Sequence, residues 1–265
     1  MSGHDKTPRA PEDNSMADPW INLRPLTAAR IGLARSGASL ATAPLLDFRL
    51  AHARARDAVN AAFDAEALAA GLREAGIPAR AGDSAAPDKR SYLMRPDLGR
   101  ALAPETEAAL RAHRGDAGVD VAFIVSDGLS ALAVETHGAP VLSRVLPILR
   151  DASLSLAPVT VLNRGRVAIG DRVAALLGAQ CAVVLIGERP GLSAPDSMGA
   201  YLTWRPGAKT TDADRNCISN IRPGGIGYDK AAFKLAHLIK AICTAQLSGV
   251  ALKDTSDSPR LIGGR

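Results

Sequence analysis

Short apolar runs alternate with longer segments of helical pattern from residue 119 onward, and this alternation limits the fold more than any other feature of the sequence. Each run is rich in Val and Ile and too short for a helix, as expected of a buried strand. Strands are predicted over residues 119–125, 158–162 and 181–187, and a further apolar run spans 200–204. Strands that alternate with helices form a parallel sheet covered on both faces. We therefore expect an α/β fold with a Rossmann-like parallel sheet.

The segments around these runs have the signals of helices. Residues 126–130 end the first strand and cap a helix, and Gly178 ends another. The predicted helices span residues 141–149, 172–177 and 229–247. One long segment, 205–227, has no regular pattern but many hydrogen-bonding side chains, and long unpatterned segments inside a domain are usually functional or disordered. We favour a functional role for it.

The part of the chain before residue 115 is predicted to be mainly helical. Its helices span residues 45–60, 64–75 and 104–113, and Pro25 suits the first turn of an earlier one. Residues 79–89 are expected to form a polar loop, and 91–100 an extended stretch that ends in a turn. The expected domains are a disordered leader (1–19), an N-terminal helical domain with its connector (20–114), the Rossmann-like α/β domain (115–252) and a tail (253–265).

Composition excludes several classes of protein. The net charge is +5, but the arginines are spread thinly and form no basic stripe with aromatic residues, so we expect no nucleic-acid binding. The three cysteines match no zinc spacing and suggest a reducing cytosol. The leader lacks the apolar centre of a secretory signal, and no apolar run is long enough to span a bilayer. A cytoplasmic protein is expected.

A candidate site follows the strand over residues 181–187. There Glu188 and Arg189 stand beside a Pro-Gly turn, and ligands of open parallel sheets bind beyond the carboxyl ends of the strands. In the simplest alternative, Glu188 pairs with Arg189 or a helix end. No Ser-His-Asp set stands out, and His137, expected in a loop without a second ligand nearby, does not predict a metal site.

The glycine clusters at 165–170 and 224–227 each precede a predicted helix, but neither matches a complete phosphate-binding fingerprint. The simplest interpretation of both is a turn that needs positive φ. Residue chemistry alone therefore predicts a small-molecule site at the strand ends and leaves the ligand open.

Blocks in several of these stretches are more specific when taken together. They are SYLMRPDLGR (91–100), VSDGLS (125–130), GRV (165–167), GERPGL (187–192) and ADRNCISNIRPGG (213–225). In this order they resemble the small subunit, or light chain, of ethanolamine ammonia-lyase, the adenosylcobalamin-dependent enzyme that converts ethanolamine to acetaldehyde and ammonia. The resemblance covers most of residues 91–225, whereas residues 20–80 match only in general character.

The resemblance implies a non-catalytic light chain that covers cobalamin from the side opposite a large barrel subunit, with six copies of each subunit. It assigns cofactor binding to Val167, Glu188 and Cys217, all expected in loops at the rim of the sheet. No histidine fits the Asp-x-His-x-x-Gly motif of proteins that replace the lower base, so none is expected to ligate cobalt. Some relatives enter bacterial microcompartments, but the leader shows no obvious amphipathic helix for targeting.

Two other functions are consistent with the same sequence features. A stand-alone Rossmann-like nucleotide-binding module would hold phosphate at residues 165–170. A structural scaffold would bind no ligand. Titration of the lone chain with NAD or ATP would distinguish the nucleotide-binding module from the light chain.

Overall fold

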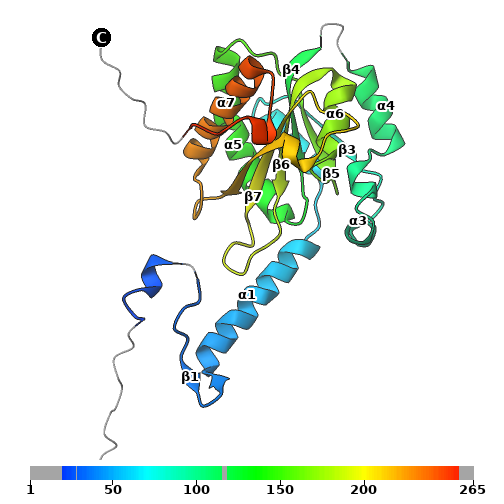
Figure 1. Cartoon of the computed structure of the whole chain (residues 1–265). Coiled ribbons are helices and arrows are strands. Elements are labelled where there is room, and N and C mark those ends of the chain that lie inside the picture. Colours follow the sequence, from blue (N-terminus) through cyan, green and yellow to red (C-terminus); the bar gives the residue numbers. More distant parts are fainter. Residues whose placement is uncertain (1–19, 28, 115–117, 257–265) are drawn as a thin grey trace, which may run out of the picture. The chain divides into compact units, whose positions relative to one another are not determined.

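The computed structural model describes residues 20–27, 29–114 and 118–256, which belong to two compact units that divide between Ala51 and His52 (Figure 1). The expected leader, 1–19, and most of the expected tail lie outside the described residues. In the first unit, Pro25 does occupy a helical first turn, but only the 3-10 helix η1 (Arg24–Leu26) forms there. The small antiparallel pair β1 (Arg35–Ser36) and β2 (Ser39–Leu40) follows.

The second unit is built on a six-stranded sheet with strand order β3-β5-β4-β6-β7-β8. The strands are β3 (Ala79–Asp83), β4 (Val119–Ser126), β5 (Val159–Asn163), β6 (Ala179–Gly187), β7 (Met198–Trp204) and β8 (Arg215–Ile221). β3, β5, β4 and β6 pair in parallel, whereas β7 pairs antiparallel to both β6 and β8. The expected α/β fold with a mostly parallel, Rossmann-like sheet is therefore confirmed.

Helices cover both faces of this sheet (Figure 1). They are α2 (Ala65–Glu74), α4 (Pro104–Ala112), α5 (Ala131–Asp151), α6 (Ile169–Leu177) and α7 (Tyr228–Ala245). The other helices are α1 (Thr42–Asn60), within which the two units divide, α3 (Lys89–Met94), and the 3-10 helices η2 (Leu98–Arg100), η3 (Asp212–Asp214) and η4 (Gly249–Ala251). Strand β4 shows why both faces need cover: Val121, Phe123 and Val125 are buried on the α5–α7 side, and Ala122 and Ile124 on the α6 side.

Local signals fix several helix ends as predicted. Asp64 caps α2 by accepting hydrogen bonds from the amides of Glu66 and Ala67 at 2.9 and 3.0 Å. The Ser130 hydroxyl accepts from the Ala133 amide at 3.3 Å and caps α5. Gly178 ends α6 with φ +69°, a left-handed conformation that favours glycine.

Three segments differ from the expectations. The expected polar loop 79–89 contains strand β3, whose half-buried residues pair with β5. The expected extended stretch 91–100 holds most of α3, which Asp88 caps, and η2. The unpatterned segment 205–227 contains strand β8, in which Arg215, Ile218 and Ile221 are buried. These elements depend on pairing and caps that alternation of apolar residues does not reveal.

The loop assignment of His137 is also wrong. The residue lies in α5, which is longer than expected and contains both Pro140 and Pro147. Its side chain is buried, and Nδ1 lies 2.8 Å from the Tyr228 hydroxyl. His137 is therefore a core residue of the α5–α7 layer.

The segment that follows α7 packs against β8. The Asn216 side chain donates to the carbonyls of Gly249 at 3.3 Å and Leu252 at 3.0 Å, and accepts from the Gly249 amide at 2.8 Å. The last strand of the sheet is thus joined to this segment through the side chain of Asn216.

Candidate functional site

A pocket of about 440 Å³ lies at the carboxyl ends of β4, β5 and β6, where sequence reasoning placed a site. It is lined by Tyr92, Gly128, Leu129, Arg166, Val167, Ile186, Gly187, Glu188, Arg189 and Tyr201. The lining combines apolar side chains with guanidinium and carboxylate groups. Two of the predicted residues, Val167 and Glu188, lie in this lining.

Glu188 directly follows β6, and its carboxylate joins three strands. It accepts hydrogen bonds from the hydroxyls of Ser197 and Ser219 and from the amide of Asn220 at 3.2 Å. The simple alternative, a pair with Arg189 or a helix end, is therefore wrong. A carboxylate has about four acceptor positions, so roughly one remains for a ligand.

Cys217 lies in strand β8, so its expected place in a loop is wrong. It pairs in register with Tyr201 of β7, a neighbour in the pocket wall, and its side chain is exposed. Desolvation by the surrounding protein raises the pKa of the Cys217 thiol, and the charge of Glu188 adds to the rise. Burial also raises the pKa of Tyr201 to about 12. Both groups are thus neutral at physiological pH.

Val167 lies in the turn between β5 and α6 and is half-buried. The positive φ expected for the glycines of this turn is absent, as it is for those at 224–227. Close packing explains the presence of glycine at two of these positions instead. A Cβ on Gly165 would lie 2.8 Å from Ser126 Oγ, and one on Gly170 would lie 2.3 Å from Val184 Cγ2.

The same turn is a poor phosphate cradle, because most of its backbone amides already have acceptors. The Gly165 amide donates to Ser126 Oγ at 2.8 Å, and the Arg166 amide donates to the Gly99 carbonyl at 2.7 Å. The amides of Ile169, Gly170 and Asp171 donate to carbonyls inside the turn. A phosphate held by a helix N-terminus needs free amides, so the geometry disfavours the nucleotide-binding alternative.

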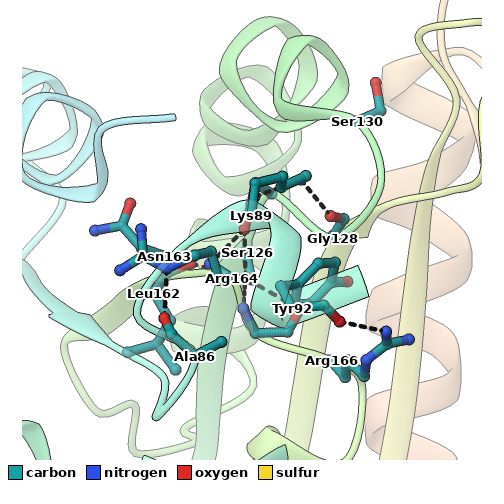
Figure 2. A network of polar contacts seen from close by, with 12 residues as sticks. Ala86, Lys89, Tyr92, Ser126, Gly128, Ser130, Leu162, Asn163, Arg164 and Arg166 are labelled. Atoms are coloured by element: carbon teal, nitrogen blue, oxygen red, sulfur yellow. Dashed lines mark hydrogen bonds and ion pairs between the residues drawn. The ribbon is translucent and has the colours of Figure 1, made fainter. Parts of the chain in front are cut away.

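A polar network next to the pocket was not predicted from the sequence (Figure 2). Its centre is Asp127, which follows β4 and is buried. The Asp127 carboxylate accepts from Lys89 Nζ at 3.0 Å and from the Arg164 amide at 2.6 Å. Arg164 in turn donates to the Ala86 carbonyl at 2.7 Å. The network links the loops after β3, β4 and β5. In the sequence, the feature that could have indicated it is the position of the Asp127 carboxylate directly after a predicted buried strand.

Tyr92 closes one side of the pocket. Its ring is buried, and Arg166 and Lys89 place cationic groups 4.5 and 5.1 Å from the ring centroid. Arg166 Nη2 also donates to the Tyr92 carbonyl at 2.8 Å (Figure 2). Helix α3 is thereby attached to the turn that carries Val167.

The sheet topology defines a Rossmann-like α/β protein with a pocket at its strand ends, and comparison with known proteins identifies its family. The model of the ethanolamine ammonia-lyase light chain family matches residues 17–253. The ethanolamine ammonia-lyase small subunit of Azotobacter vinelandii is 51% identical over 248 residues, 93% of this chain and 92% of that protein. The small subunit of Xanthomonas campestris pv. campestris is 52% identical over 248 residues, 92% of this chain and 90% of that protein.

The chain belongs to the ethanolamine ammonia-lyase light chain family. The resemblance drawn from the sequence blocks is thus confirmed, and with it the expectation of a light chain of a lyase that acts in ethanolamine degradation. The name small subunit implies a larger partner subunit. Among the described residues, no helix is long and apolar enough to cross a membrane.

Proposed function

We propose that the strand-end pocket is one side of an adenosylcobalamin site, whose other side belongs to the large subunit of an ethanolamine ammonia-lyase. The observation that carries this proposal is the convergence of Val167, Glu188 and Cys217. Val167 and Glu188 line one pocket, and Cys217 pairs with Tyr201 of the same wall. Adenosylcobalamin, when bound, supplies the radical chemistry that converts ethanolamine to acetaldehyde and ammonia.

The chemistry of the lining fits the edge of a corrin. Corrin rims carry amide side chains, which need hydrogen-bonding partners, beside an apolar ring. The free acceptor position of Glu188 suits an amide N–H, since hydrogen bonds to charged acceptors are strong. Val167, Ile186 and Leu129 supply apolar surface. A volume of about 440 Å³ lies within the range of drug-sized ligands, so it takes only part of so large a cofactor.

The roles of the three residues follow from their contacts. Glu188 orients an amide of the rim while its other acceptor positions hold β8 in place. Val167 offers an apolar contact from the turn before α6. Cys217 presents a neutral thiol from the exposed face of β8. None of them moves a proton or forms a covalent bond in this proposal, which leaves catalysis to the partner subunit.

The test is Glu188→Ala in the complex reconstituted with the large subunit. Loss of one hydrogen bond to a charged group is expected to raise the Kd of cobalamin roughly 10- to 150-fold, since such bonds contribute about 1.5–3 kcal/mol. Glu188→Gln keeps one acceptor oxygen and is expected to lie between wild type and Glu188→Ala. The readout is spectroscopic titration with cobalamin, with the size of the complex measured in parallel.

Glu74→Ala is the matched control, because Glu74 is an exposed carboxylate at the end of α2. It should leave the Kd unchanged. An unchanged Kd in Glu188→Ala, with the complex intact, would remove Glu188 from the site.

We further propose that the large subunit is a barrel, that the complex contains six copies of each subunit and that it is cytoplasmic. Cell fractionation would decide whether the complex lies inside or outside a microcompartment.

A further inference from the structure

A second pocket, of about 410 Å³, lies beside the first, and its lining contains three arginines and one carboxylate, Asp212. Arg166 and Val167 line both pockets, so one ligand that rests on Val167 can reach from one into the other. Arg100, Thr210 and Arg215 line the second pocket. Its residues come from η2, the turn before α6 and the segment before β8.

Two of the three arginines keep their charge available. Arg215 is neutralised: Nη1 and Nη2 lie 2.7 Å from the two oxygens of Asp171, and its side chain is 3% exposed. Arg100 is exposed and, in the described part of the chain, forms no hydrogen bond or ion pair through its side chain. Arg166 likewise has no carboxylate partner among the described residues, and its Nε is buried without an acceptor.

We infer that this second pocket binds one phosphate-type anion through Arg100 and Arg166. Guanidinium groups bind phosphate oxygens through paired N–H donors. Thr210 Oγ1 accepts from the Gly207 amide at 2.8 Å, which leaves its O–H free to donate to the anion. The inference rests on the proposed function in its choice of ligand, because the phosphodiester of the nucleotide tail is the anionic group of cobalamin. Inorganic phosphate offers the same chemistry.

The test compares cobalamin with cobinamide, which lacks the nucleotide tail and its phosphate, in the complex reconstituted with the large subunit. Arg100→Gln is expected to raise the Kd of cobalamin roughly 3- to 10-fold, between the effects of an exposed ion pair and of a charged hydrogen bond. The Kd of cobinamide should stay the same. Arg100→Lys, which keeps the charge, should recover part of the cobalamin affinity. Arg150→Gln removes an exposed charge from the far end of α5 and should change neither Kd.

Inorganic phosphate separates the two sources of the anion. If the pocket serves free phosphate, phosphate should raise the Tm of the wild-type complex but not of Arg100→Gln, and the variant should bind cobalamin and cobinamide as wild type does. Equal weakening of both corrinoids by Arg100→Gln, or no effect in any of these measurements, would overturn the inference. If Glu188→Ala weakens both ligands while Arg100→Gln weakens neither and leaves the effect of phosphate on the Tm unchanged, the second-pocket inference fails and the proposed function stands.

Discussion

At the scale of single residues, Cys217 combines exposure with a proton that is hard to remove. Its pKa is raised by desolvation first and by the Glu188 charge as well, while a hydrogen bond with Tyr201 opposes the rise. The thiolate is the reactive form of cysteine, so exposure alone does not make this thiol reactive. The folded protein also holds this proton more tightly than the unfolded chain. The thiol therefore lowers stability as pH rises past about 8.5, its unfolded pKa.

We expect iodoacetamide to alkylate Cys217 severalfold more slowly than the same cysteine in the urea-unfolded chain at pH 8. The rate should rise as the pH is raised, because the fraction of thiolate increases. Mass spectrometry of the modified peptides measures both rates. Cys181 is buried and serves as the unreactive reference. Faster alkylation of Cys217 in the folded chain at pH 8 would contradict the direction of the pKa shift.

The place of Glu188 could be predicted from sequence, but its partners could not. An apolar strand followed by a charged turn identifies the end of β6 without any tertiary information. Ser219 and Asn220, in contrast, reach Glu188 only because β8 lies beside β7 in the sheet. Asp127 is a similar case, since its cation Lys89 comes from α3, a helix that was not predicted.

At the scale of elements, the strands with continuous apolar runs were predictable and the two edge strands were not. β4 and β6 are buried on both faces and read as apolar runs. β3 is half-buried throughout, and β8 alternates irregularly because its pairing with β7 shifts register between Met198 and Ala200. Edge strands carry polar residues, so apolar pattern alone does not distinguish them from loops.

The packing of α6 on β6 leads to a prediction at this scale. Gly170→Ala should lower the free energy of unfolding by about 1–3 kcal/mol, because the new Cβ would lie 2.3 Å from Val184 Cγ2 in a packed core. Gly71→Ala in α2 is the matched variant, since a Cβ there meets nothing within 4 Å. It should raise stability by about 0.5–1 kcal/mol through helix propensity. Urea unfolding measures both, and the same sign for the two variants would contradict the packing account.

At the scale of the whole molecule, both hydrophobic core clusters consist of residues from Ala65 onward. A fragment of residues 52–265 should therefore keep a cooperative thermal transition. Its Tm should lie within about 4 °C of that of the full chain, the shift that a loss of roughly 1 kcal/mol in the free energy of unfolding produces. A fragment that starts at residue 89 also loses α2 and β3 and should unfold at a much lower temperature. Circular dichroism measures both transitions. An equal loss in the two fragments would show that residues before 52 carry part of the core stability.

The short segment that Asn216 holds against β8 has a consequence for a light chain that has not yet met its partner. An open strand edge is a template on which another copy can add its own strand, and growth by that route leads to insoluble aggregates. Residues 249–252 pack against this strand, so we expect that their deletion would make the free light chain more prone to aggregate, which light scattering would measure.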